Sequence, residues 1–104
     1  MPQVFRVAER EADLLTRGQG ELVRAQLVEL HETLAPGERL TIDFAGVSAM
    51  TPSFADECFG KLAERLGANV FRSSVRLVGA DEVVRVLVNS VLARRLGAGR
   101  KEPA

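Results

Sequence analysis

The chain has 104 residues, 46% of them hydrophobic, so it is long enough for one domain with one modest core. Its 14 basic and 14 acidic residues cancel, which excludes a large electrostatic field for nucleic acid or a membrane surface. A single cysteine excludes an internal disulfide and suits a reducing compartment, and no apolar run has the length of a signal peptide or a membrane span, so we expect a cytoplasmic protein.

The first half of the chain predicts a strand, a helix and a second strand. Residues 4–7 are short and mostly apolar, which predicts an edge strand. Residues 16–20, Thr-Arg-Gly-Gln-Gly, predict a turn before a helix over residues 20–34. Residues 38–44 predict the next strand. The helix is indicated by apolar side chains at helical spacing, namely Val23, Leu27, Leu30 and Leu34.

The second half repeats this alternation. A helix is predicted over residues 52–66, a strand over residues 75–78 and a last helix over residues 81–96. Val70 and Phe71 are interpreted as an extended connection. We expect one domain over residues 1–96 and a flexible basic tail over residues 97–104.

This β-α-β-α-β-α order predicts the fold class. Strands that alternate with helices form a mostly parallel or mixed sheet, joined by right-handed crossovers. We therefore expect a small single-domain α/β sandwich in which the helices pack on the sheet.

The segment from Leu40 to Glu57 gathers hydroxyls and carboxylates where a strand ends and a helix begins. Pro52 suits the first helical position and makes Thr51 the N-cap, although Ser53 could cap the helix instead with Asp56 at the third position. In either register Ser53 lies in the first turn. A phosphate on Ser53 would meet the helix dipole and free N–H groups, opposed by the charges of Asp56 and Glu57.

Three acids of this segment, Asp43, Asp56 and Glu57, have ordinary structural interpretations. A strand-end aspartate accepts backbone hydrogen bonds at a turn, and acids in a first helical turn complement the helix dipole. A Mg²⁺ site is the less favoured interpretation. We predict no metal site and no cofactor.

A different hypothesis comes from Arg17, Gly18 and Gly20. A dinucleotide fingerprint needs a third small residue where this chain has Val23, so the pattern is interpreted as a turn. Arg17 beside the helix N-terminus could still hold an anion. The alternative function is therefore a small nucleotide- or anion-binding module.

Neither His31 nor Cys58 predicts catalysis. His31 lacks a second metal ligand at suitable spacing and is interpreted as a boundary residue. Cys58 lies on the apolar side of its helix and is interpreted as a core residue. A hydrolase that uses Ser53 and His31 would lack the Gly-x-Ser-x-Gly elbow. We predict no catalytic residues and no enzyme activity.

A family resemblance is carried by Ile-Asp-Phe-Ala-Gly-Val at residues 42–47, Ser-Phe-Ala-Asp-Glu at 53–57, and Phe59-Gly60. These motifs resemble the bacterial STAS-like domain family of unassigned function, over roughly residues 4–96. The wider STAS fold includes the anti-sigma-factor antagonists, small cytoplasmic modules that bind a serine kinase and are switched by phosphorylation. The resemblance implies a non-catalytic regulatory module in signal transduction, with a protein partner such as a histidine-kinase-like ATPase.

The resemblance also implies a site. The regulatory serine of the antagonists lies in an Asp-Ser-Ser-Gly-like turn at the start of the helix after a central strand, and Ser53 has the similar position here. This chain differs from that turn in having Thr51, Pro52 and Phe54 around Ser53. The implied partner-binding residues are Val47, Ser48, Thr51, Ser53, Asp56 and Glu57.

Overall fold

The computed structural model describes residues 3–10 and 14–97. No helix in this described part is long and apolar enough to cross a bilayer. The elements follow in chain order: β1 (Gln3–Arg6), α1 (Val7–Arg10), α2 (Arg17–Glu32), β2 (Leu40–Asp43), α3 (Pro52–Ala55), the π-helical turn η1 (Asp56–Gly60), α4 (Lys61–Leu66), α5 (Ala68–Ser74), β3 (Val75–Val78) and α6 (Glu82–Arg95).

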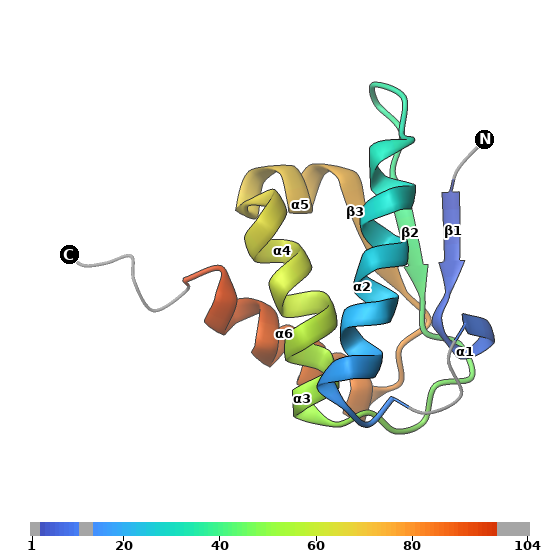
Figure 1. The fold of residues 1–104 in the computed structure, drawn as a ribbon, viewed down its shortest axis with the longest axis vertical. Helices are drawn as coiled ribbons and strands as arrows, with labels where there is room; N and C mark the ends of the chain where they lie inside the picture. Colours follow the sequence, from blue (N-terminus) through green and yellow to red (C-terminus); the bar gives the residue numbers. More distant parts are fainter. Residues whose placement is uncertain (1–2, 11–13, 98–104) are drawn as a thin grey trace.

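The three strands form a parallel sheet in the order β1-β2-β3. Phe5 pairs in register with Ile42, and Ile42 pairs with Leu77. The crossovers from β1 to β2 and from β2 to β3 run in the same direction across the sheet, so α2 and α4 lie on one face, where α6 also packs (Figure 1). The prediction of an α/β fold is confirmed, and it takes the form of two layers.

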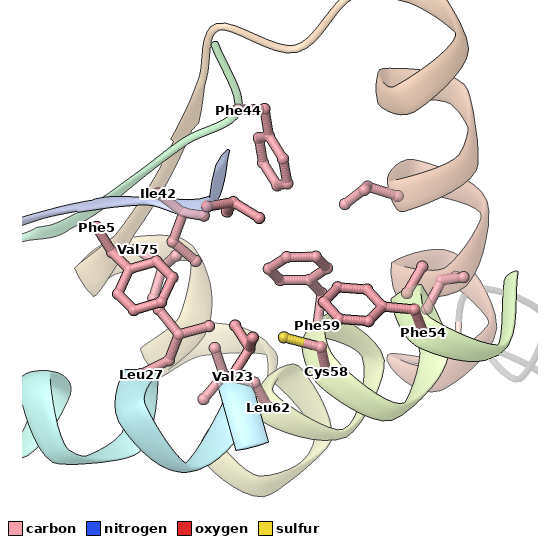
Figure 2. Packing of buried hydrophobic residues seen from close by; sticks show 14 of the residues in the cluster. Phe5, Val23, Leu27, Ile42, Phe44, Phe54, Cys58, Phe59, Leu62 and Val75 are labelled. Atoms are coloured by element: carbon pink, nitrogen blue, oxygen red, sulfur yellow. The ribbon is translucent and has the colours of Figure 1, made fainter. Parts of the chain in front are cut away.

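The core fills the space between the sheet and these helices. Figure 2 shows Phe5, Ile42 and Val75 on the strands facing Leu27 of α2 and Phe59 of η1. The Phe59 ring makes edge-to-face contacts with Phe44 at 5.2 Å and with Phe54 at 6.1 Å between centroids. The stretch from α3 to α4 is thereby fixed against the sheet.

The predicted turn over residues 16–20 is wrong, because α2 already begins at Arg17. Thr16 is its N-cap: the Thr16 hydroxyl accepts from the Gln19 backbone at 3.1 Å, and the Thr16 backbone N–H donates to the Gln19 side chain at 3.0 Å. These two hydrogen bonds satisfy the backbone N–H groups of Thr16 and Gln19, which would otherwise lack partners at the helix start. This stabilisation outweighs the low helix propensity of Gly18 and Gly20.

The predicted extended connection at Val70 and Phe71 is also wrong, because both residues lie in α5. Gly67, with φ of 87°, separates α4 from α5, and Phe71 is buried against the core. The last helix agrees with its prediction, and the Asp81 carboxylate caps it by accepting from the Val84 N–H at 2.9 Å. The predicted tail lies outside the described residues, apart from Gly97.

Candidate functional site

The segment between β2 and α3 begins with a turn at Asp43. Its carboxylate accepts a hydrogen bond from the Ala45 N–H at 2.9 Å, and it lies 3.9 Å from the Arg6 guanidinium. The predicted role of Asp43 as a backbone acceptor at a turn is confirmed.

The helical segment after this loop begins at an N-cap, Thr51. The Thr51 hydroxyl accepts from the Phe54 N–H at 3.1 Å, with Pro52 in the first position. This confirms the first of the two predicted registers, and the register with Ser53 as the cap is wrong. Thr51 also donates from its hydroxyl to the Leu15 carbonyl at 2.7 Å and from its N–H to the Leu14 carbonyl at 3.0 Å. The start of α3 is therefore tied to the chain that enters α2.

An exposed leucine lies beside this cap. Leu15 is 54% exposed. Ser53 is half-buried, and no described residue hydrogen-bonds its hydroxyl. We call this region the helix-start surface, and it consists of the exposed or half-buried residues Leu15, Ser48, Ala49, Pro52 and Ser53. Val47, which was predicted to belong to it, is buried.

The two acids that follow Ser53 are buried in ion pairs. Asp56 is 8% exposed and accepts two parallel hydrogen bonds from Arg95 of α6, at 2.8 Å from Nε and 2.7 Å from Nη2. Arg17 of α2 donates a third, at 3.2 Å. The bidentate Arg95 contact, more than any other group, holds the pKa of Asp56 well below its usual range.

Glu57 has a different set of cations. Its carboxylate accepts from Arg24 of α2 at 3.0 Å and lies 3.1 Å from Lys61 and 3.3 Å from Arg17. The Arg24 hydrogen bond is the main cause of a lowered pKa at Glu57. Arg24 also donates to the Glu57 backbone carbonyl.

These contacts make Asp56 and Glu57 a bridge between helices. Asp56 is held mainly by Arg95 of α6 and Glu57 mainly by Arg24 of α2, while Arg17 of α2 contacts both acids. Both were predicted as partner contacts, yet both are buried with their oxygens engaged by the protein's own cations. The prediction that these acids belong to an exposed surface is corrected: they are buried and connect α2, η1, α4 and α6.

The bridge predicts how stability depends on pH. The pKa values of Asp56 and Glu57 are lower in the folded protein than in the unfolded chain, where they are about 4. The ionised carboxylates therefore stabilise the folded state fully above about pH 4, and this stabilisation is lost as the pH falls toward the folded-state pKa values. We expect the urea midpoint to fall below about pH 4, and to fall less in Asp56→Asn, which has no carboxylate to protonate there. Identical pH profiles for the two proteins would contradict this assignment.

The glycines proposed to hold an anion lie within a helix. Gly18 and Gly20 lie inside α2, not in a turn. A Cβ at Gly20 would lie 2.9 Å from the Phe54 carbonyl oxygen, so glycine lets α2 approach α3 closely. Arg17, the cation of that proposal, contacts Asp56 and Glu57.

His31 and Cys58 are also engaged elsewhere. His31 Nε2 lies 2.8 Å from the Ser74 hydroxyl, and no described base reaches Ser53. Cys58 is fully buried, which raises the pKa of its thiol, and the prediction of a core cysteine is confirmed. The described residues contain no group of three or more His, Cys, Asp and Glu side chains that could hold a metal ion.

Comparison with known proteins assigns the chain to a family. Searches of curated proteins and of solved structures find no match. The profile of one family, described as "STAS-like domain of unknown function (DUF4325)", matches residues 19–85, which span most of α2, all of β2, α3, η1, α4, α5 and β3, and the start of α6. The chain therefore belongs to this family of STAS-like domains.

Proposed function

We propose that this chain is a non-catalytic regulatory module that binds a protein partner through the helix-start surface. One observation carries the proposal: the exposed Leu15 is hydrogen-bonded to the Thr51 cap, beside Ser53. Protein interfaces combine an apolar centre with a polar rim, and Leu15 among Ser48, Ala49, Pro52 and Ser53 offers such a combination. By its resemblance to the antagonists of the STAS fold, the proposed partner is a histidine-kinase-like ATPase.

Ser53 is the proposed switch. A phosphate there would add charge to the first turn of a continuous helical segment, which the helix dipole favours. The carboxylates of Asp56 and Glu57, which would otherwise repel it, are neutralised by Arg17, Arg24 and Arg95. The phosphate would also change the polarity of the surface next to Leu15.

A binding role suits Ser53 better than a catalytic one. A serine nucleophile needs an adjacent base, and His31 instead contacts Ser74. The alternative function, a small nucleotide- or anion-binding module, has less support because Gly20 packs against α3 and Arg17 contacts the bridge. ATP, GTP or Mg²⁺ at millimolar concentration should leave the melting temperature unchanged, since only a ligand that binds the folded state raises it.

The proposal predicts how Ser53 variants bind. Calorimetric titration of the full chain with a histidine-kinase-like ATPase from the same organism is expected to show binding that Ser53→Asp weakens about tenfold, a difference of about 1.4 kcal/mol. The matched control is Ser90→Asp, at an exposed serine on α6, which should bind like the unchanged protein.

Leu15→Ala tests the apolar half of the same surface against Val70→Ala, at a 45% exposed residue of α5. Only Leu15→Ala should weaken binding. Affinities unchanged by both Ser53→Asp and Leu15→Ala would refute the proposed surface.

A further inference from the structure

Within the described part of the chain, no helix packs on the face of the sheet that points away from α2, α4 and α6. Along each strand, residues that point into the core alternate with residues that point outward. The covered face carries Phe5, Ile42 and Leu77, and α2, α4 and α6 lie on that side (Figure 1). The residues that point outward are Val4, Arg6, Thr41, Asp43, Arg76 and Val78. We call these residues, together with Arg39 just before β2, the open sheet face.

The open sheet face is basic, although the whole chain has a formal net charge of zero. Arg6 is partly neutralised by Asp43, at 3.9 Å. Arg39 and Arg76 are exposed, and neither has an ion pair within the described part of the chain. Three arginines against one aspartate leave a local excess of positive charge.

We propose that the open sheet face binds an acidic segment of a partner protein. Arg76 is paired in register with Thr41, two residues beyond Arg39, so the two arginines lie diagonally across neighbouring strands, roughly 7–8 Å apart at Cα. Alternate residues of an extended chain are spaced by roughly 6.5–7 Å. Carboxylates at alternate positions of an extended segment therefore match these two guanidinium groups.

The rest of the face favours a protein occupant over the other candidates. Val4, 38% exposed, Thr41 and Val78 give the mixed apolar and polar character of a protein interface. The outward residues of β1, β2 and β3 include no aromatic ring for a base to stack on, which disfavours single-stranded nucleic acid. A second copy packed face to face would set three arginines against three, with one aspartate on each side.

This surface lies on the opposite side of the sheet from the helix layer that carries Ser53 (Figure 1). Because the two surfaces do not overlap, the module can hold one protein at the helix-start surface and a second at the open sheet face. This inference goes beyond the proposed function and does not depend on the identity of the first partner.

The test is a titration of the full ¹⁵N-labelled chain with an octaglutamate peptide, followed by amide chemical shifts. We expect shifts centred on β1, β2 and β3, and an affinity that Arg39→Glu/Arg76→Glu lowers about tenfold. Arg39→Gln/Arg76→Gln neutralises the two charges without reversing them, so it should weaken binding less than Arg39→Glu/Arg76→Glu. The matched control is Arg65→Glu/Arg85→Glu, which reverses two exposed arginines of α4 and α6 and should leave the affinity unchanged.

Three results would overturn the proposal. The first is a set of shifts centred on helix amides, or an affinity that is unaffected by the changes at Arg39 and Arg76. The second is tighter binding of a single-stranded DNA of equal charge at the same amides, which would identify a nucleic-acid surface. The third is a dimer in sedimentation that Arg39→Glu/Arg76→Glu dissociates, which would identify a second copy as the occupant.

Discussion

Asp56→Asn is expected to lower the free energy of unfolding by about 3 kcal/mol, because it leaves two arginines of different helices without their carboxylate. Asp56 is 8% exposed and receives the bidentate contact from Arg95 as well as the contact from Arg17. Asparagine has nearly the same volume, so the effect measures charge and hydrogen bonding, not a cavity. Urea unfolding followed by circular dichroism gives the value.

The matched control is Glu64→Gln. Glu64 binds the same Arg95, at 3.1 Å, but its side chain is 56% exposed. An exposed ion pair contributes up to about 1 kcal/mol, so the control should change stability little. Equal losses in the two variants would mean that the buried position of Asp56 has no special importance.

Gly20→Ala is expected to lower the free energy of unfolding by about 2 kcal/mol, the opposite of what helix propensity predicts. A Cβ at this position would lie 2.9 Å from the Phe54 carbonyl oxygen and 3.1 Å from the Glu57 Cβ. Backbone atoms cannot rotate away as a side chain can, so α2 and α3 would have to separate. Chemical unfolding measures the loss.

Gly18 provides the control, two residues earlier in the same helix. The nearest atom to a Cβ there is the Thr16 hydroxyl oxygen, at 3.9 Å. Gly18→Ala should therefore raise stability, by up to about 1 kcal/mol, through helix propensity alone. If both alanine variants change stability in the same direction, the close approach of α2 to α3 is not the reason for glycine at position 20.

The fold could be predicted from the sequence because the apolar periodicity of each long element is clear. The start of α2 could not, since Gly18 and Gly20 were interpreted as breakers while the capping pair of Thr16 and Gln19 starts the helix before them. The α5 helix was missed for a related reason. Its seven residues are too few for a periodic pattern, and Val70 and Phe71 favour extended structure.

The candidate site was predicted in part. Pro52 correctly indicated the cap at Thr51, because that preference is local. The burial of Asp56 and Glu57 was missed, since their cations come from the distant helices α2 and α6. A signal was nevertheless present. Phe54-Ala55 and Cys58-Phe59 flank the acids, and a helix that is apolar on both sides of a charged pair must bury that pair with partners.

We propose that partners contact the helix-start surface, while Asp56 and Glu57 connect the helices behind it. Hydrogen–deuterium exchange of the full chain, with and without the kinase-like ATPase, separates these two roles. We predict new protection at the amides of residues 48–54 and at Leu15, with exchange at the η1 amides unchanged. Protection that spares residues 48–54, or that is centred on η1, would contradict the account.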